Sequence, residues 1–383
     1  MLGNRLRIAR LFGIPIYLDG SWLIIFALVT YSLAASYFPS LYPRWSSFTY
    51  WGVALITSVL FFLSVLVHEL AHSLVSLALG QRVRGITLFI FGGIAEIEEE
   101  PPRALYEFLV AVVGPLTSMA IGVVSLFVGW VIFWWLWPVQ TVHAVLRYIG
   151  VLNVLLAVFN LLPGFPLDGG RIFRSLVWAL TGSYRRATQI ATTVGEGLAW
   201  LFIIGGGILV FSGHVFDGIW LAFIGWFILS AARGTMQAVE MRRLLEPVPV
   251  AQLMRTTLPV VVPYLTLDVL ADTILNTGQR AFLVRDPQEG PLGIVTLSDV
   301  QGVPASQRAE MRVADVMTPF DALLTVKPSD SLWQALELMA KHDVHQVLVV
   351  DETGEIVGVV RRNDILRFLQ LQAETRFGRP DAS

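Results

Sequence analysis

The sequence predicts an α-helical polytopic membrane domain, with six transmembrane helices and a small β-hairpin, followed by a soluble α/β domain. Three observations predict this fold class. The 383 residues are 55% hydrophobic and 15% charged, whereas soluble globular domains carry about 25% charged residues. Six stretches contain the roughly 20 mostly apolar residues that a membrane helix needs. After residue 245 the sequence changes to mixed charge and short β-type runs.

The spans are expected at 20–39, 50–79, 107–137, 144–163, 190–212 and 215–233. Arginines precede the first span as in a signal peptide, but the apolar run is long for one and five more spans follow, so we expect a retained helix. Most arginines of this region fall on the side that both termini share, and the opposite loops carry only Arg44 and Arg147. Because cytoplasmic loops are enriched in Arg and Lys, we expect both termini to be cytoplasmic.

Two segments of this region are not expected to be transmembrane helix. Residues 82–98 show an alternating pattern of side-chain hydrophobicity and contain a Gly-Gly pair, which is typical of a short β-hairpin. Residues 163–170, with the sequence PGFPLDGG, hold two prolines and three glycines and must end the fourth span. The absence of cysteine excludes disulfides, a thiolate nucleophile and a cysteine-ligated zinc site.

The second span contains the sequence VHELAHSL, with His68, Glu69 and His72. Ionisable residues inside a membrane are costly and are therefore functional candidates. Positions i and i+4 share one helix face, so both imidazoles can bind one ion. This H-E-x-x-H pattern suits zinc, with the glutamate taking a proton from water. The alternative is a polar seam between helices.

A catalytic zinc site needs a third protein ligand. We expect Asp168 to be that ligand, because it follows the fourth span at a depth similar to that of His68. The alternative is that Asp168 only caps the following helix, with Gly169 and Gly170 in a turn.

Together these motifs resemble the site-2 protease family of intramembrane zinc metalloproteases. The resemblance covers about residues 5–235 and includes GIPIYLDGSWL near the N-terminus, the hairpin around FGGIAEI, GPLTS at 114–118, and the segment from Asn160 to Gly169. It implies that His68, His72 and Asp168 hold one Zn²⁺ per chain and that Glu69 acts as general base and then as general acid.

The resemblance also implies a substrate-binding region. Asn160 would hydrogen-bond the substrate carbonyl or its oxyanion, unless it only caps a helix end. The strand at Gly92 and Gly93 would pair with an unwound substrate, unless it only packs. Asn153 is a further candidate near the site, or it bonds another helix.

The second part of the chain contains an internal repeat. Residues 250–263 match 313–326, and 290–300 match 354–366. Each copy is predicted as strand, helix, strand, strand, helix, and two such copies should pack as one unit.

This repeat resembles a tandem pair of CBS domains over about 248–372. Such pairs often bind adenine nucleotides, here ATP or AMP. The family's Thr/Ser-x-x-Asp element is present as Thr296 and Asp299, and the second copy has Arg361 and Asp364 in its place. The alternative is that the pair only dimerises or couples mechanically.

These observations divide the chain into a metalloprotease domain (1–240), a linker (241–248), the first CBS domain (249–305), the second CBS domain (312–372) and a flexible tail (373–383). We expect a zinc endopeptidase of a prokaryotic plasma membrane that cleaves transmembrane or juxtamembrane substrates near the cytoplasmic face. The substrate would be a membrane protein, for example an anti-sigma factor or another single-span protein. A homodimer through the CBS pair is the further expected partner, and no nucleic acid is expected.

Two other classes of function fit part of this pattern. A metal transporter or channel gated by the CBS pair would also carry intramembrane His and Asp, although it has no particular need of the base Glu69. An inactive scaffold would need neither the ligands nor the base.

Overall fold

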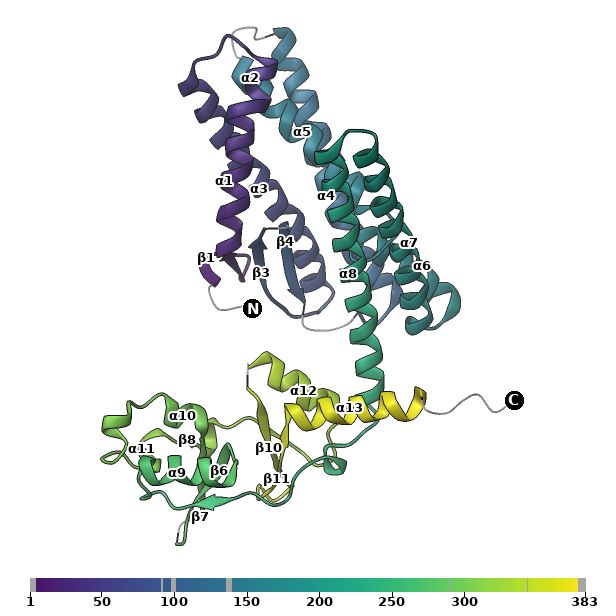
Figure 1. The fold of residues 1–383 in the computed structure, drawn as a ribbon. Coiled ribbons are helices and arrows are strands. Elements are labelled where there is room, and N and C mark those ends of the chain that lie inside the picture. The colour runs from purple at the N-terminus through teal and green to yellow at the C-terminus, as the bar shows by residue number, and fades with distance from the viewer. Residues whose placement is uncertain are drawn as a thin grey trace. The chain divides into compact units, whose positions relative to one another are not determined.

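The computed structural model describes residues 5–90, 92–97, 101–135, 140–288, 290–342 and 344–377. It divides into two units, Met1–Gln237 and Ala238–Ser383 (Figure 1). In the described part of the chain, six helical segments are long and apolar enough to cross a membrane, which confirms the six predicted spans. They are α1 (Gly20–Ser32) with its continuation through η1 (Leu33–Tyr37) and α2 (Phe38–Leu41), α3 (Ser47–Ala78), α4 (Ala104–Trp135), α5 (Gln140–Asn160), α7 (Tyr184–Phe211) and α8 (Val215–Leu245).

These helices begin where the sequence supplies capping side chains. The Asp19 carboxylate accepts from the backbone N–H of Ser21 at the start of α1, and Ser46 and Ser183 cap α3 and α7 in the same way. Large apolar side chains remain exposed along the helices, including Phe48 at 89% and Phe211 at 95%. Such a surface is unfavourable in water and favourable in lipid, in agreement with a membrane domain.

A mixed four-stranded sheet accompanies the helices, in the order β1-β2-β3-β4. The predicted hairpin is confirmed as β3 (Val83–Phe89) and β4 (Gly92–Ile97). The strands β1 (Arg5–Leu11) and β2 (Ile14–Asp19) were not predicted. They are joined by Phe12 and Gly13, both with positive φ, as a two-residue hairpin turn requires. The sheet packs Ile14, Ile16 and Ile86 against Leu66 and Leu70 of α3, on either side of His68 in sequence.

The break after α5 leads into α6 (Asp168–Thr181), the helix that was expected after Asp168 but without bounds. Leu167 occupies the N-cap position and Asp168 is the first helical residue, so Asp168 is not the cap. Gly169 and Gly170 are helical and buried rather than part of a turn. A Cβ at either glycine would collide with the backbone of residues 161–165, so these glycines let α6 pack directly against the loop.

The second unit confirms the predicted order of elements in each repeat. The first copy has β5 (Val260–Val261), α9 (Leu267–Thr277), β6 (Ala281–Asp286), β7 (Gly290–Thr296) and α10 (Leu297–Gln301). The second has α11 (Val313–Val316), β8 (Thr318–Pro319), β9 (Thr325–Val326), α12 (Leu332–Lys341), β10 (Gln346–Val350), β11 (Ile356–Arg361) and α13 (Arg362–Phe377).

The segment that leads into each CBS copy forms backbone hydrogen bonds with the other copy. Arg255 exchanges two backbone hydrogen bonds with Val359 of β11, at 2.9 and 3.0 Å. In return, β8 pairs with β7, and the backbone N–H of Val313 donates to the carbonyl of Leu265 at 2.8 Å. The two copies therefore form one folding unit, as the repeat predicts.

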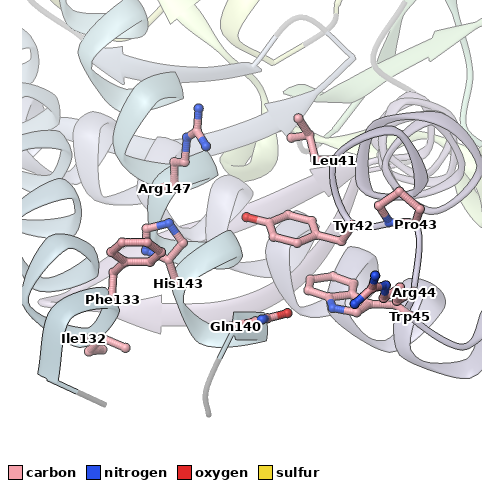
Figure 2. Close-up of a pocket in the computed structure, with 10 residues that line it drawn as sticks. All are labelled: Leu41, Tyr42, Pro43, Arg44, Trp45, Ile132, Phe133, Gln140, His143 and Arg147. Carbon is pink, nitrogen blue, oxygen red and sulfur yellow. The ribbon is translucent and has the colours of Figure 1, made fainter. Parts of the chain in front are cut away.

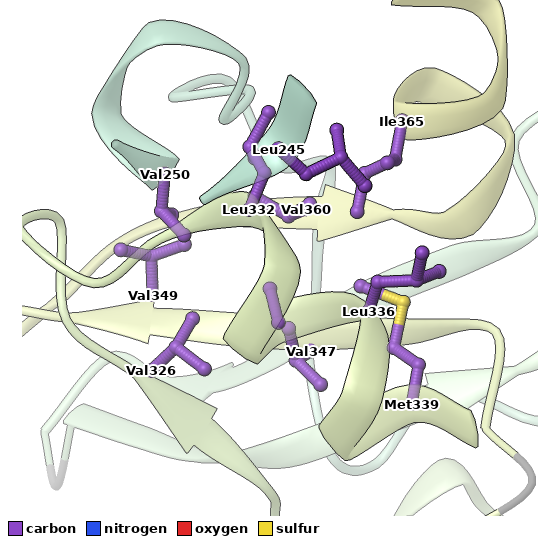
Figure 3. Packing of buried hydrophobic residues seen from close by; sticks show 11 residues of the cluster. Leu245, Val250, Val326, Leu332, Leu336, Met339, Val347, Val349, Val360 and Ile365 are labelled. Atoms are coloured by element: carbon purple, nitrogen blue, oxygen red, sulfur yellow. The ribbon is translucent and has the colours of Figure 1, made fainter. Parts of the chain in front are cut away.

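The last turn of α8 belongs to the core of this unit. Leu245 is fully buried with side chains of the second copy, and Figure 3 shows it beside Leu332, Val360 and Ile365. The helix therefore runs past residue 233, where the sequence analysis ended the sixth span, and includes part of the segment 241–248.

Candidate metal centre

Three side chains from two helices converge on one point. His68 and His72 lie on adjacent turns of α3 and are each 4% exposed, and Asp168 comes from the first turn of α6. Oδ2 of Asp168 lies 3.2 Å from Nε2 of His68 and 3.1 Å from Nε2 of His72. The two Nε2 atoms are 3.2 Å apart. These three groups could together hold a metal ion.

The far nitrogens of both imidazoles are held by α4. Nδ1 of His72 is 2.6 Å from the carbonyl oxygen of Val110, and Nδ1 of His68 is 2.8 Å from Oγ of Ser118. A carbonyl only accepts, so Nδ1 of His72 carries the proton and, in the neutral ring, Nε2 presents a lone pair. Second partners of this kind orient the histidines of metal sites.

The donor set fits zinc. Two neutral imidazoles and a carboxylate would direct three lone pairs at one another, and a cation relieves that repulsion. Tetrahedral zinc with ligand distances of about 2.1 Å separates its ligand atoms by roughly 3.4 Å, close to the 3.1–3.2 Å triangle of this site.

Helix α4 approaches the imidazoles so closely that only glycine fits. A Cβ at Gly114 would overlap Nε2 of His72 and lie 2.8 Å from Nε2 of His68. Residues 114–118 belong to the family motif GPLTS, but no role of Gly114 or Ser118 was predicted from the sequence. The spacing of four residues between them, one helical turn, was the available signal.

Glu69 lies beside the donor triangle rather than at one of its corners. Its half-buried side chain faces β4, where a Cβ at Gly93 would lie 2.5 Å from Cγ of Glu69. The backbone of Ala95 in the same strand hydrogen-bonds the carboxylate. The edge strand of the sheet therefore passes directly along the carboxylate, with Gly92 at its first position.

The two asparagines differ in their surroundings. Asn153 is fully buried, and its amide nitrogen donates to Oγ of Ser64 on α3 at 3.0 Å and to the carbonyl of Ile149 at 2.9 Å. Ser64 lies one turn before His68. Asn160 is the last residue of α5 and half-buried, and its side chain has no hydrogen-bond partner among the residues that the structure describes.

The four candidate nucleotide-binding residues belong to the second unit, and each has a partner there. Thr296 and Asp299 form a capping box at the start of α10, with Oδ2 of Asp299 accepting from the N–H and hydroxyl of Thr296. Asp364 accepts from Arg255 at 2.6 and 3.0 Å. Arg361 donates to Gln279 at 3.3 Å.

Comparison with known proteins places these residues in a family. Residues 56–137 and 137–203 match peptidase family M50, and residues 250–305 and 313–371 match the CBS domain. The chain is 34% identical over 375 residues to sll0528, a candidate zinc metalloprotease of Synechocystis, covering 97% of both chains. The chain belongs to peptidase family M50. It is a zinc metalloprotease of the site-2 protease type that carries a tandem CBS pair.

Two further relatives match over almost the full length of both chains. The candidate zinc metalloprotease Rip3 of Mycobacterium tuberculosis is 31% identical over 95% of this chain and 92% of its own length. The zinc metalloprotease MJ0392 of Methanocaldococcus jannaschii is 27% identical over 96% of each. The site-2 protease structure from the latter organism covers 61% of this chain and 95% of its own, at 28% identity and a TM-score of 0.41.

Proposed function

We propose that this M50 peptidase cuts membrane-protein substrates within or beside the membrane, and that His68, His72 and Asp168 hold one zinc ion per chain. The observation that carries the proposal is the convergence of the three donor atoms at 3.1–3.2 Å, with Glu69 beside them. When bound, zinc supplies a Lewis acid that polarises the peptide carbonyl and makes water more acidic.

Glu69 moves the proton in this mechanism. Its carboxylate takes a proton from the attacking water and delivers it to the leaving amine nitrogen as the peptide bond breaks. Its position next to β4 supports this role, because a substrate lying along that strand would bring its scissile bond to the carboxylate.

The substrate would bind as an added strand. β4 is the edge of the sheet, and an edge strand offers unpaired backbone groups to an extended peptide. A transmembrane helix must unwind before its backbone can be cut, and pairing with Gly92 and Gly93 would replace the hydrogen bonds that it loses. The absence of a Cβ at Gly93 lets this strand lie directly against the side chain of Glu69.

Asn160 would hydrogen-bond the substrate carbonyl oxygen, and the lack of another partner for its amide among the described residues supports that role. Asn153 is better suited to bridging α3 and α5, because its amide nitrogen is already shared between Ser64 and Ile149. Its contribution to substrate binding would then be indirect, through the turn of α3 that precedes His68.

The CBS pair would regulate the peptidase, through ATP or AMP at Thr296, Asp299, Arg361 and Asp364 or through a homodimer. A prokaryotic plasma membrane with both chain termini in the cytoplasm fits the distribution of arginines. Regulated proteolysis of a single-span protein such as an anti-sigma factor is the corresponding role. A CBS-gated metal transporter gains no specific support, since the base and the edge strand have no task in transport.

The decisive experiment is proteolysis of a membrane-embedded substrate by the purified full chain. Glu69→Gln should abolish cleavage while zinc remains bound, whereas Asp168→Ala should lose both zinc and cleavage. Glu196→Gln is the matched control, because Glu196 lies on α7 in an exposed ion pair with Arg233. Cleavage by Glu69→Gln at the wild-type rate would refute the role of Glu69, and stoichiometric zinc in Asp168→Ala would refute the ligand set.

A further inference from the structure

The first unit contains a cavity that the metal centre does not use. It has a volume of about 580 Å³ and is lined by the segment between α2 and α3, the end of α4 and the start of α5 (Figure 2). The lining residues are Leu41, Tyr42, Pro43, Arg44, Trp45, Ile132, Phe133, Gln140, His143 and Arg147. All of these residues belong to the first unit.

The charge of this cavity is positive. Arg44 and Arg147 are both exposed at its wall, none of the lining residues is acidic, and neither arginine forms an ion pair within the described ranges of the chain. Arg147 lies next to the Tyr42 hydroxyl, a neutral partner that leaves the guanidinium charge uncompensated. Two guanidinium groups in such a setting favour an oxyanion, which they can bind with paired hydrogen bonds.

The two arginines come from segments that are far apart in the sequence. Every other arginine of 1–237 lies towards the opposite ends of the spans, in or near the N-terminal strands, the hairpin, α6, the start of α7 and the later part of α8. Outer loops of membrane proteins generally avoid basic residues. Arg44 and Arg147 are the two exceptions to this rule, and both line the same cavity. This indicates that they bind the same ligand.

The surroundings of the cavity match the interface of a membrane. Trp and Tyr gather at the level of lipid headgroups, and exposed residues of these types at this end of the spans include Tyr31, Trp51, Trp130 and Trp134. Within the cavity, Trp45 stacks on Tyr42 at 4.4 Å and Phe133 packs against His143 at 5.1 Å. The wall is thus part aromatic and part cationic.

We propose that this cavity binds the phosphate group of an anionic phospholipid, with Arg44 and Arg147 contacting the phosphate oxygens and Leu41, Ile132 and Phe133 contacting the glycerol and upper acyl chains. An anionic lipid matches the charge of the arginines and the apolar side chains together, whereas a free phosphate matches only the charge. The cavity is distinct in sequence and in lining from the metal ligands, so the site would exist whether or not the chain is catalytically active.

The test is native mass spectrometry of the full chain released from detergent micelles that contain dioleoylphosphatidylglycerol or dioleoylglycerol. These two lipids share their acyl chains, and only the first carries the anionic phosphoglycerol headgroup. We expect one phosphatidylglycerol to be retained per chain and dioleoylglycerol to be lost. Arg44→Gln with Arg147→Gln should weaken retention at least about tenfold, as expected for the loss of charge-assisted hydrogen bonds.

The matched control is Arg7→Gln with Arg103→Gln, which removes the same charge from two exposed positions elsewhere in the first unit and should leave retention unchanged. Arg44→Lys with Arg147→Lys keeps the charge without the paired donors and should give intermediate retention. Zinc content and melting temperature report whether each variant is folded. Equal retention of the two lipids, or unchanged retention in a folded double Gln variant, would overturn the proposal. Displacement by an equal concentration of inorganic phosphate would overturn the lipid assignment.

Discussion

Arg174 of α6 and Glu107 of α4 form an ion pair inside the first unit. Nε of Arg174 donates to Oε1 of Glu107 at 2.7 Å, and the side chains are 8% and 0% exposed. The guanidinium lies between the rings of Phe165 and Tyr184, at 4.8 and 4.6 Å from their centroids. This cluster holds α6, and with it Asp168, against the helix that also orients both histidines.

Removing one charge of this pair should therefore be costly. Arg174→Met leaves Glu107 buried and unpaired, and we expect the free energy of unfolding to fall by about 3–5 kcal/mol. Adding Glu107→Leu should recover part of that loss, because no buried charge remains. Titration with sodium dodecyl sulfate in mixed micelles measures both variants, with the exposed Arg186→Ala as control. Wild-type stability in Arg174→Met would contradict this account.

The hydroxyl of Ser118 should tune the affinity for zinc. It is the partner of His68 at Nδ1, and loss of such partners typically weakens metal binding 10- to 100-fold. Ser118→Ala is therefore expected to lose zinc to a chelator at a lower concentration than wild type. Thr117→Ala is the matched control, because the Thr117 hydroxyl bonds Val113 of its own helix. Similar chelator midpoints for the two variants would argue against an orienting role.

Gly114 should tolerate no side chain. In Gly114→Ala the new methyl group meets Nε2 of both histidines, so we expect zinc content and cleavage to be lost although alanine favours helix. Gly197→Ala on α7 adds the same methyl group where nothing lies within 4 Å, and it should be neutral or stabilising by up to about 1 kcal/mol. Metal analysis of both purified variants decides the matter. A zinc-loaded Gly114→Ala would show that the histidines can move aside.

In the CBS pair, substitutions in the ion pair of Arg255 and Asp364 can distinguish a structural role of these residues from a role in ligand binding. Arg255 is 51% exposed, so Arg255→Ala should cost less than about 1 kcal/mol of stability. If Asp364 holds the ribose of AMP, Asp364→Ala should lose AMP binding and Arg255→Ala should keep it, as isothermal titration of the full chain would measure. Equal AMP affinity in wild type and Asp364→Ala would show that Asp364 does not contribute to AMP binding.

Asp299 needs a different interpretation, because its carboxylate closes the capping box with Thr296. Asp299→Ala is expected to destabilise the CBS unit by about 0.5–2 kcal/mol even without nucleotide. The neighbouring exposed Ser298→Ala should change stability little. Thermal melting of the two variants without nucleotide tests this. No difference between them would mean that the capping box contributes little.

Much of the architecture could be predicted because it follows from local pattern. Long apolar runs, the 82–98 alternation and the repeat each define their own elements, and His68 and His72 share a helix face by spacing alone. The strands β1 and β2 were not predicted although they form a local hairpin, and the pairing of β2 with β3 depends on a segment that is distant in sequence. The roles of Gly114 and Ser118 were not predicted because they depend on how closely α4 crosses α3, which is a tertiary distance. Burial of Glu107 with Arg174 likewise becomes visible only once α4 and α6 are packed together.

The exchange of leading segments between the CBS copies sets the order of events during synthesis. Residues 248–255 reach their hydrogen-bond partners only when Pro328, Asp330 and Val359 have left the ribosome, roughly 80 to 100 residues later. At about 5–20 residues per second, that interval lasts about 4 to 20 seconds. During this interval the first CBS copy still lacks its partner segments, so the membrane helices can insert well before the CBS unit is complete. A chain that stops near residue 305 would leave the first copy without β8 and residues 250–255 without their hydrogen-bond partners.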